Sequence, residues 1–182
     1  MKKTFILVTT ILASVFVANK GFAQEAEDAE LVRVYRWYNP QDQNYVTVAD
    51  GEMQDGQLLN WKWKDKTMIF VAYRNPAPGR VAVNSWYNPD TKDYASIAED
   101  EFNDDQMIKM GYSAKHVQFY ALTRRGPNTV AVYRWNVTKN HDWVTVPDDS
   151  NTDAYFKKGY RNKSFQFYGI ARGTDAAIYN QL

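Results

Sequence analysis

The sequence predicts a mostly β fold, in which three copies of one unit form a three-fold pseudo-symmetric repeat domain of the β-trefoil-like or small propeller-like kind. Three observations lead to this prediction. Aromatic residues recur at a fixed interval, as Trp37, Trp86 and Trp135 do at 49 residues. Every copy carries the same series of strand-type runs, divided by turn residues and one acidic segment. The chain contains no cysteine, so core packing must hold the copies together.

Five columns of residues follow the period, and the last two are spaced by 48 instead of 49 residues before the third copy because its acidic segment is one residue shorter. They are Trp37, Trp86 and Trp135; Tyr45, Tyr94 and Trp143; Thr47, Ser96 and Thr145; Trp63, Tyr112 and Tyr160; and Phe70, Phe119 and Phe167. A unit of about 49 residues cannot bury its own faces, so the copies must pack on one another. We therefore predict a single domain over residues 32–173, with copies at 32–78, 79–127 and 128–173.

Each copy opens with a predicted strand that is apolar on both faces, as is typical of a strand covered on two sides. These strands are "VRVYRWY" at 32–38, "RVAVNSWY" at 80–87 and "TVAVYRW" at 129–135. In the first two copies an Asn-Pro pair follows, and proline favours a turn because it fixes φ and has no backbone N–H to donate.

The second predicted strand alternates in character. It reads "YVTV" at 45–48, "YASI" at 94–97 and "WVTV" at 143–146. Valine, alanine and isoleucine point to one face, whereas the aromatic and the hydroxyl residue share the other.

An acidic segment and a third strand complete each copy. Early acids and late lysines suit the dipole of a helix, and Gly111 and Gly159 stand where a glycine ends one. We expect one short helix or helical turn in each copy. The third strands are predicted at 67–73, 116–122 and 164–170.

The N-terminal residues have the features of an export signal. Lys2 and Lys3 precede an apolar run over 4–18, and Gly21-Phe22-Ala23 offers a small-x-small cleavage pattern. The apolar run is shorter than the roughly 20 residues of a membrane span. We predict a signal peptide over 1–23 with cleavage near Ala23, an acidic flexible leader over 24–31, and a C-terminal tail over 174–182. The mature protein is then secreted, periplasmic or at the cell surface, with no membrane span.

The charge of the chain is close to balanced. Its formal net charge is +1, and removal of the three lysines in residues 1–23 makes it slightly negative. Such a balance gives no reason to expect a nucleic acid or an anionic membrane as partner.

The unit also resembles a known repeat. The motifs that carry the resemblance are "VYRWYNP" at 34–40, "GY" at 111–112, and "QFY" at 118–120 and 166–168. They are similar to the repeat of an uncharacterised family of secreted bacterial β-domains, three to a domain, with a lectin-like or β-trefoil-like character. The resemblance implies architecture and export. Where that family tends to place a histidine, this chain has Tyr45, Tyr94 and Trp143.

The repeated aromatic–polar pattern predicts up to three weak, equivalent carbohydrate-binding sites, one in each copy. A sugar ring packs its C–H face on an aromatic ring, and its hydroxyls bond to nearby acceptors and donors. The candidate residues are the platforms Tyr45, Tyr94 and Trp143, the acceptors Asp42, Asp93 and Asp142, and the hydroxyls Thr47, Ser96 and Thr145. The function expected is a secreted, non-catalytic module for a glycan or cell-wall polysaccharide.

Other interpretations stay open at this stage. The aromatic residues of the second strands can equally be core, as the tryptophans of the first strands are expected to be. The alternative function is an extracellular or envelope structural protein that binds another envelope protein or itself. No catalytic motif is present, so no enzyme is expected, and no metal or other cofactor is predicted.

Overall fold

The computed structural model describes residues 30–137, 142–148, 154 and 159–174. The chain divides into two parts, Met1–Glu30 and Leu31–Leu182, and every described strand and helix belongs to the second. The predicted signal peptide, most of the predicted leader and nearly all of the predicted tail lie outside the described residues.

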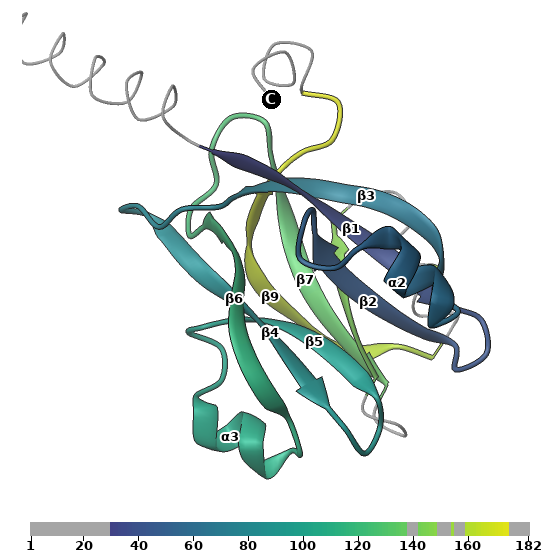
Figure 1. Cartoon of the computed structure of the whole chain (residues 1–182). Helices are drawn as coiled ribbons and strands as arrows, with labels where there is room; N and C mark the ends of the chain where they lie inside the picture. The colour runs from purple at the N-terminus through teal and green to yellow at the C-terminus, as the bar shows by residue number, and fades with distance from the viewer. Residues whose placement is uncertain (1–29, 138–141, 149–153, 155–158, 175–182) are drawn as a thin grey trace, which may run out of the picture. The chain divides into compact units, whose positions relative to one another are not determined.

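The described part of the chain is mostly β with two short helices, which confirms the predicted class (Figure 1). We call three successive segments unit 1, unit 2 and unit 3. Unit 1 contains β1 (Leu31–Asn39), β2 (Asn44–Ala49), α2 (Asp55–Asn60) and β3 (Lys64–Tyr73); unit 2 contains β4 (Arg80–Asn88), β5 (Asp93–Ala98), α3 (Asp104–Lys109) and β6 (Ser113–Leu122); unit 3 contains β7 (Thr129–Val137), β8 (Asp142–Pro147) and β9 (Arg161–Ile170).

The strands pair in the same way within each unit. The first strand pairs antiparallel with both the second and the third, and its pairing with the third contains two register shifts in every unit. Single residue pairs then join the units, through Tyr73 with Tyr120, Leu122 with Tyr168 and Val71 with Ile170. All nine strands therefore belong to one antiparallel sheet.

Three phenylalanines meet where the third strands come together. The ring centroids of Phe70, Phe119 and Phe167 lie 5.6 to 5.8 Å apart, and each pair is edge-to-face. This is the geometry that aromatic quadrupoles favour. Gly169 leaves room for them, because a Cβ there would lie 2.8 Å from the Phe70 ring. The repeated phenylalanine column thus forms the centre of the main core cluster.

The second strands β2, β5 and β8 are almost entirely buried, on both of their faces. They contact one another across the units, so the aromatic–hydroxyl face of each is covered by its neighbours. Alternation in the sequence marks two different faces here, and both faces are covered except at Tyr94, which is half-buried.

The two helices lie within the acidic segments of units 1 and 2, as predicted, and they are at separate places on the domain (Figure 1). At α3 the Asn103 side chain accepts a hydrogen bond from the Gln106 backbone at 2.9 Å, and the Gln106 side-chain oxygen accepts one from the Asn103 backbone N–H at 3.0 Å, so a capping box starts the helix. The acidic segment of unit 3, where we expected a third helix, lies largely outside the described residues. No helix of the described chain is long and apolar enough to cross a membrane.

The backbone after each acidic segment takes a left-handed turn. Gly111 and Gly159 have φ of 88° and 94°, as expected of glycines that end a helix, whereas Lys62 holds the corresponding position of unit 1 at φ 70°. A residue with a Cβ is strained in this region, and glycine is not.

Lys62→Gly is therefore expected to stabilise the domain, by about 0.5–1 kcal/mol, because it removes the left-handed strain. Chemical denaturation monitored by tryptophan fluorescence measures the change. Lys62→Ala is the control, since it removes the same side chain and keeps the Cβ. An equal gain in both variants would trace the effect to the lysine side chain and contradict the backbone explanation.

Candidate functional site

A pocket of about 250 Å³ opens between unit 1 and unit 2. It is lined by Asn39, Asp42, Trp61 and Trp63 of unit 1 and by Tyr87, Lys92 and Tyr94 of unit 2. We call it the aromatic pocket. Four of its seven lining residues are aromatic, and two of the others are charged, so it offers both apolar faces and polar groups to a ligand.

The aromatic wall has one exposed and several partly covered rings. Trp61, just after α2, is 45% exposed. Tyr87 and Tyr94 are half-buried and face each other across the β4–β5 hairpin, with ring centroids 4.6 Å apart and planes tilted by 38°. Burial raises the pKa of Tyr94, and the neighbouring Tyr87 and Glu52 add to that effect. The Tyr94 hydroxyl therefore stays protonated at neutral pH and is able to donate a hydrogen bond.

Two asparagine-anchored turns place the charged residues of the pocket. The Asn39 side-chain oxygen accepts a hydrogen bond from the Gln41 backbone at 2.9 Å, and its amide donates to Asp42 Oδ2 at 2.9 Å. In unit 2 the Asn88 oxygen accepts from the backbone of Asp90 at 3.0 Å. These are the asparagines of the predicted Asn-Pro turns, and they fix the loops that carry Asp42 and Lys92.

Only one of the three predicted platforms borders the pocket. Tyr94 lines it together with the predicted acceptor Asp42, whereas Tyr45 and Trp143 are each only 6% exposed. Each of the three rings packs against the core cluster of a different unit from its own. Tyr94 lies against the Trp37–Trp63 cluster of unit 1.

The other two rings are covered more fully. Tyr45 of unit 1 belongs to a cluster with Trp135 and Tyr160 of unit 3. Trp143 of unit 3 packs among residues of unit 2, and the Arg134 guanidinium lies 4.4 Å from its ring centroid. The core alternative that the sequence left open therefore describes these two rings.

Arg134 is itself held by an ion pair. Its Nη2 donates to Glu101 Oε1 at 2.6 Å, and Gln166 donates to the other oxygen of the same carboxylate. This network of unit 2 and unit 3 residues keeps the guanidinium over Trp143, so that face of the ring is occupied.

The predicted acceptors Asp93 and Asp142 are buried and already bonded inside the protein. The Tyr112 hydroxyl and the Asn44 amide donate to Asp93, the amide at 3.3 Å, and the Tyr160 hydroxyl donates to Asp142. The residue of unit 1 that corresponds to these two is Asn44, which also begins its strand, and not Asp42.

Burial governs the ionisation of this pair. Desolvation raises the pKa of Asp93 to about 6, against the opposing hydrogen bonds from Tyr112 and Asn44. Desolvation likewise raises the pKa of Asp142 to about 7, and the charge of Asp93 adds to the rise. The same burial, with the adjacent carboxylates, raises the pKa of both tyrosine hydroxyls.

The predicted hydroxyls Thr47, Ser96 and Thr145 are buried as well. Ser96 donates to the Gln118 side chain at 3.0 Å, and Gln118 donates to the backbone oxygen of Thr47 at 2.7 Å and to Glu52 at 2.6 Å. These groups join β2, β5 and β6 and are not at the pocket.

Sequence reasoning missed Trp61, Tyr87 and Lys92, because it searched for residues that repeat. Trp61 does not repeat, since its position holds Met110 in unit 2, whereas Tyr87 repeats in only two copies, with Tyr38 at its position in unit 1 and Asn136 in unit 3. A useful signal was the opposite one, namely an aromatic residue that breaks the repeat. Among the described residues, no group of three or more histidine or acidic side chains is placed to hold a metal ion.

The pairing scheme and the pocket define a mostly β domain of hairpin-plus-strand units with an aromatic pocket between two of them. The chain belongs to the family described as Domain of unknown function (DUF5648), whose model matches residues 34–170. No curated protein and no solved structure matches the chain.

The raised pKa values of Asp93 and Asp142 predict a stability that depends on pH. Between about pH 4 and 7 the folded state holds more protons than the unfolded chain, so the free energy of unfolding falls as the pH rises. The fall is on the order of 1 kcal/mol or more for each group. Denaturation midpoints measured from pH 4 to 8 report it.

The double variant Asp93→Asn with Asp142→Asn is expected to flatten this slope, and Asn44 already occupies the corresponding position of unit 1. Asp42→Asn, which removes an exposed carboxylate, is the matched control. A slope unchanged in the double variant, or flattened as much by the control, would refute the assignment to the buried pair.

Proposed function

We propose that this protein is a secreted, non-catalytic carbohydrate-binding module that takes a glycan or cell-wall polysaccharide in the aromatic pocket. The single observation that carries the proposal is the pairing, in one pocket, of the exposed Trp61 ring with Tyr94 and the Asp42 carboxylate. Apolar faces edged by a few polar groups are what a sugar ring needs, because each sugar has C–H faces and hydroxyl edges.

The size of the pocket favours one sugar unit. Its 250 Å³ is just below the range of about 300–1,000 Å³ that is typical of pockets for drug-sized ligands. The end of a glycan, or one unit of a chain that runs over the surface, suits such a volume. Trp61 offers a face to a neighbouring sugar because almost half of its surface is open.

The described residues support one site, at the aromatic pocket, whereas the sequence predicts as many as three equivalent ones. The rings corresponding to Tyr94 are the buried Tyr45 and Trp143. A single site gives no gain in avidity within one molecule, so strong binding to a polysaccharide requires several molecules on one polymer.

We also infer that the three units are arranged around an approximate three-fold axis, in a β-trefoil-like or propeller-like manner. Three features support this: the identical pairing scheme of the units, the three nearly equal distances among the phenylalanine rings, and the packing of each second-strand aromatic in another unit. Superposition of an experimental structure on itself after successive rotations of a third of a turn tests it.

Export supports an extracellular ligand. The charged, apolar and small-residue regions of 1–23 have the order of a cleavable signal peptide. N-terminal sequencing of the protein isolated from culture medium or periplasm is expected to begin near Gln24.

A second candidate is an envelope protein that associates with itself. It is favoured by apolar residues that face water at the same position of both helices, Leu59 at 55% and Ile108 at 60% exposed. Sedimentation velocity at increasing concentration separates the two candidates: a monomer that binds glycans fits the first, and an oligomer indifferent to every glycan fits the second.

Trp61→Ala is expected to weaken binding of the best ligand of a glycan array about tenfold, since one aromatic face contributes about 1 kcal/mol or more. Titration followed by calorimetry measures it. Met110→Ala is the control, because Met110 holds the same position in unit 2, is partly exposed and lies outside the pocket. Equal affinity of the two variants would contradict the proposed site, and no binding of any glycan to the unmodified protein would contradict the proposed function.

A further inference from the structure

We propose that the sugar taken by the aromatic pocket carries a carboxylate, and that Lys92 selects it. This inference rests on the proposed function, because it names the ligand class of the same site. The pocket has two charged residues, Asp42 and Lys92, which differ in the interactions that they already make within the protein.

The Asp42 carboxylate is partly engaged, since its Oδ2 accepts the hydrogen bond from Asn39. Lys92 makes no ion pair with any residue in the described part of the chain. The contrast with other lysines is clear: Lys66, Lys115 and Lys163 lie 2.8, 2.7 and 3.5 Å from Asp55, Asp104 and Asp148. The positive charge of Lys92 is thus available to a ligand, whereas the free oxygen of Asp42 suits a sugar hydroxyl.

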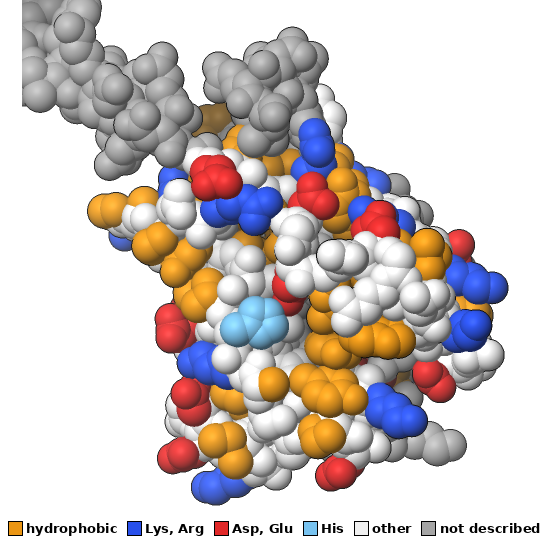
Figure 2. Space-filling model, viewed as in Figure 1, with side chains coloured by type: hydrophobic (Ala, Val, Ile, Leu, Met, Phe, Trp, Pro, Cys, Tyr) orange, Lys and Arg blue, Asp and Glu red, His pale blue; other side chains and the backbone are white. Residues whose placement is uncertain are grey.

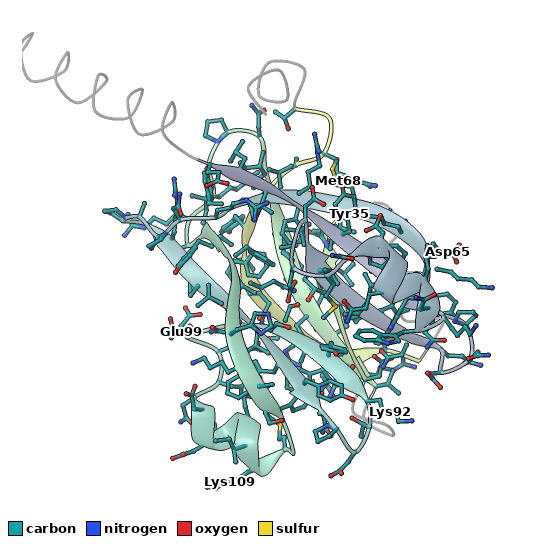
Figure 3. All side chains as sticks on the ribbon, viewed as in Figure 1. Tyr35, Asp65, Met68, Lys92, Glu99 and Lys109 are labelled. Carbon is teal, nitrogen blue, oxygen red and sulfur yellow. The ribbon has the colours of Figure 1, made fainter. Side chains whose placement is uncertain are left out.

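The backbone of Lys92 is fixed in advance. Its φ is 57°, and it stands between the turn anchored by Asn88 and the first residue of β5. That residue, Asp93, is only 1% exposed and bonded to Tyr112 and Asn44. Figure 3 shows Lys92 at the end of the β4–β5 hairpin. A fixed backbone leaves only the side chain to be ordered on binding, which lowers the entropic cost.

The surroundings of Lys92 suit an acidic sugar better than a small anion. Figure 2 shows hydrophobic side chains gathered between α2 and β5, with a basic side chain beside them. A charged ammonium–carboxylate hydrogen bond is roughly twice as strong as one between neutral groups. The aromatic rings bind the face of the sugar at the same time, so the pocket recognises a ring and a carboxylate together.

A matched pair of sugars tests the proposal. Methyl β-D-glucuronide and methyl β-D-glucoside differ in a carboxylate against a hydroxymethyl group, and the corresponding galacturonide and galactoside form a second pair. We expect calorimetry at low salt to give about fivefold to tenfold tighter binding of the acidic member of at least one pair. The preference is expected to shrink at high salt, because a partly exposed charge pair is screened.

Lys92→Gln is the decisive variant, and Gln43 shows that glutamine is accepted at the corresponding turn position, where its φ is 55°. The ratio of acidic to neutral affinity is expected to fall to about one in Lys92→Gln and to persist in Lys92→Arg, which keeps the charge. Thermal melting of each variant establishes that it is folded.

The outcomes distinguish failure of the role of Lys92 from failure of the proposed carbohydrate-binding function. Equal affinities for both members of every pair, or a preference that survives in Lys92→Gln, overturns the role of Lys92 and leaves the carbohydrate-binding proposal in place. If none of the four sugars and no array glycan binds, the proposed function itself fails, and this inference fails with it.

Discussion

The exchange of aromatic side chains between units is the interaction on which the rest of this structure depends. Tyr45 completes the core cluster of unit 3, Trp143 that of unit 2, and Tyr94 packs on that of unit 1. A unit of this size has too little interior to be stable by itself, so the core of each unit is completed by an aromatic side chain from another unit. The aromatic pocket results from the same packing, because it lies where Tyr94 of unit 2 is only partly buried against the core cluster of unit 1.

In the described part of the chain, two corresponding glutamines join neighbouring units by hydrogen bonds. Gln118 bonds to Glu52 where unit 2 meets unit 1, and Gln166 bonds to Glu101 where unit 3 meets unit 2. Ile69 holds the corresponding place before its phenylalanine in unit 1, and it is buried. A glutamine there would need a partner, and a buried polar group without one is costly, whereas isoleucine needs only apolar neighbours.

Much of the fold follows from local signals, whereas the site does not. The Asn-Pro turns, Gly111 and Gly159 act through their own backbone preferences, so the sequence alone predicts them. Burial of Tyr45 and Trp143 depends on what another unit places over them, as Phe102 and Tyr112 of unit 2 cover Trp143, and alternation along a strand carries no such information. A search for repeats does not find Trp61 and Lys92, because the corresponding positions of the other units hold different residue types. The sequence predicts Asp93 and Asp142 as acceptors for a ligand, but in the structure they accept hydrogen bonds from the Tyr112 and Tyr160 hydroxyls.

The pairing of Val71 with Ile170 joins the first unit to the last. Contacts of such long sequence separation form late, because the chain must lose the entropy of closing the intervening loop before the contact stabilises the fold. A nascent chain therefore has no complete interior until nearly all of it has been made. The export that we propose fits this delay, since an unfinished, loosely packed chain is still able to be threaded through a narrow channel.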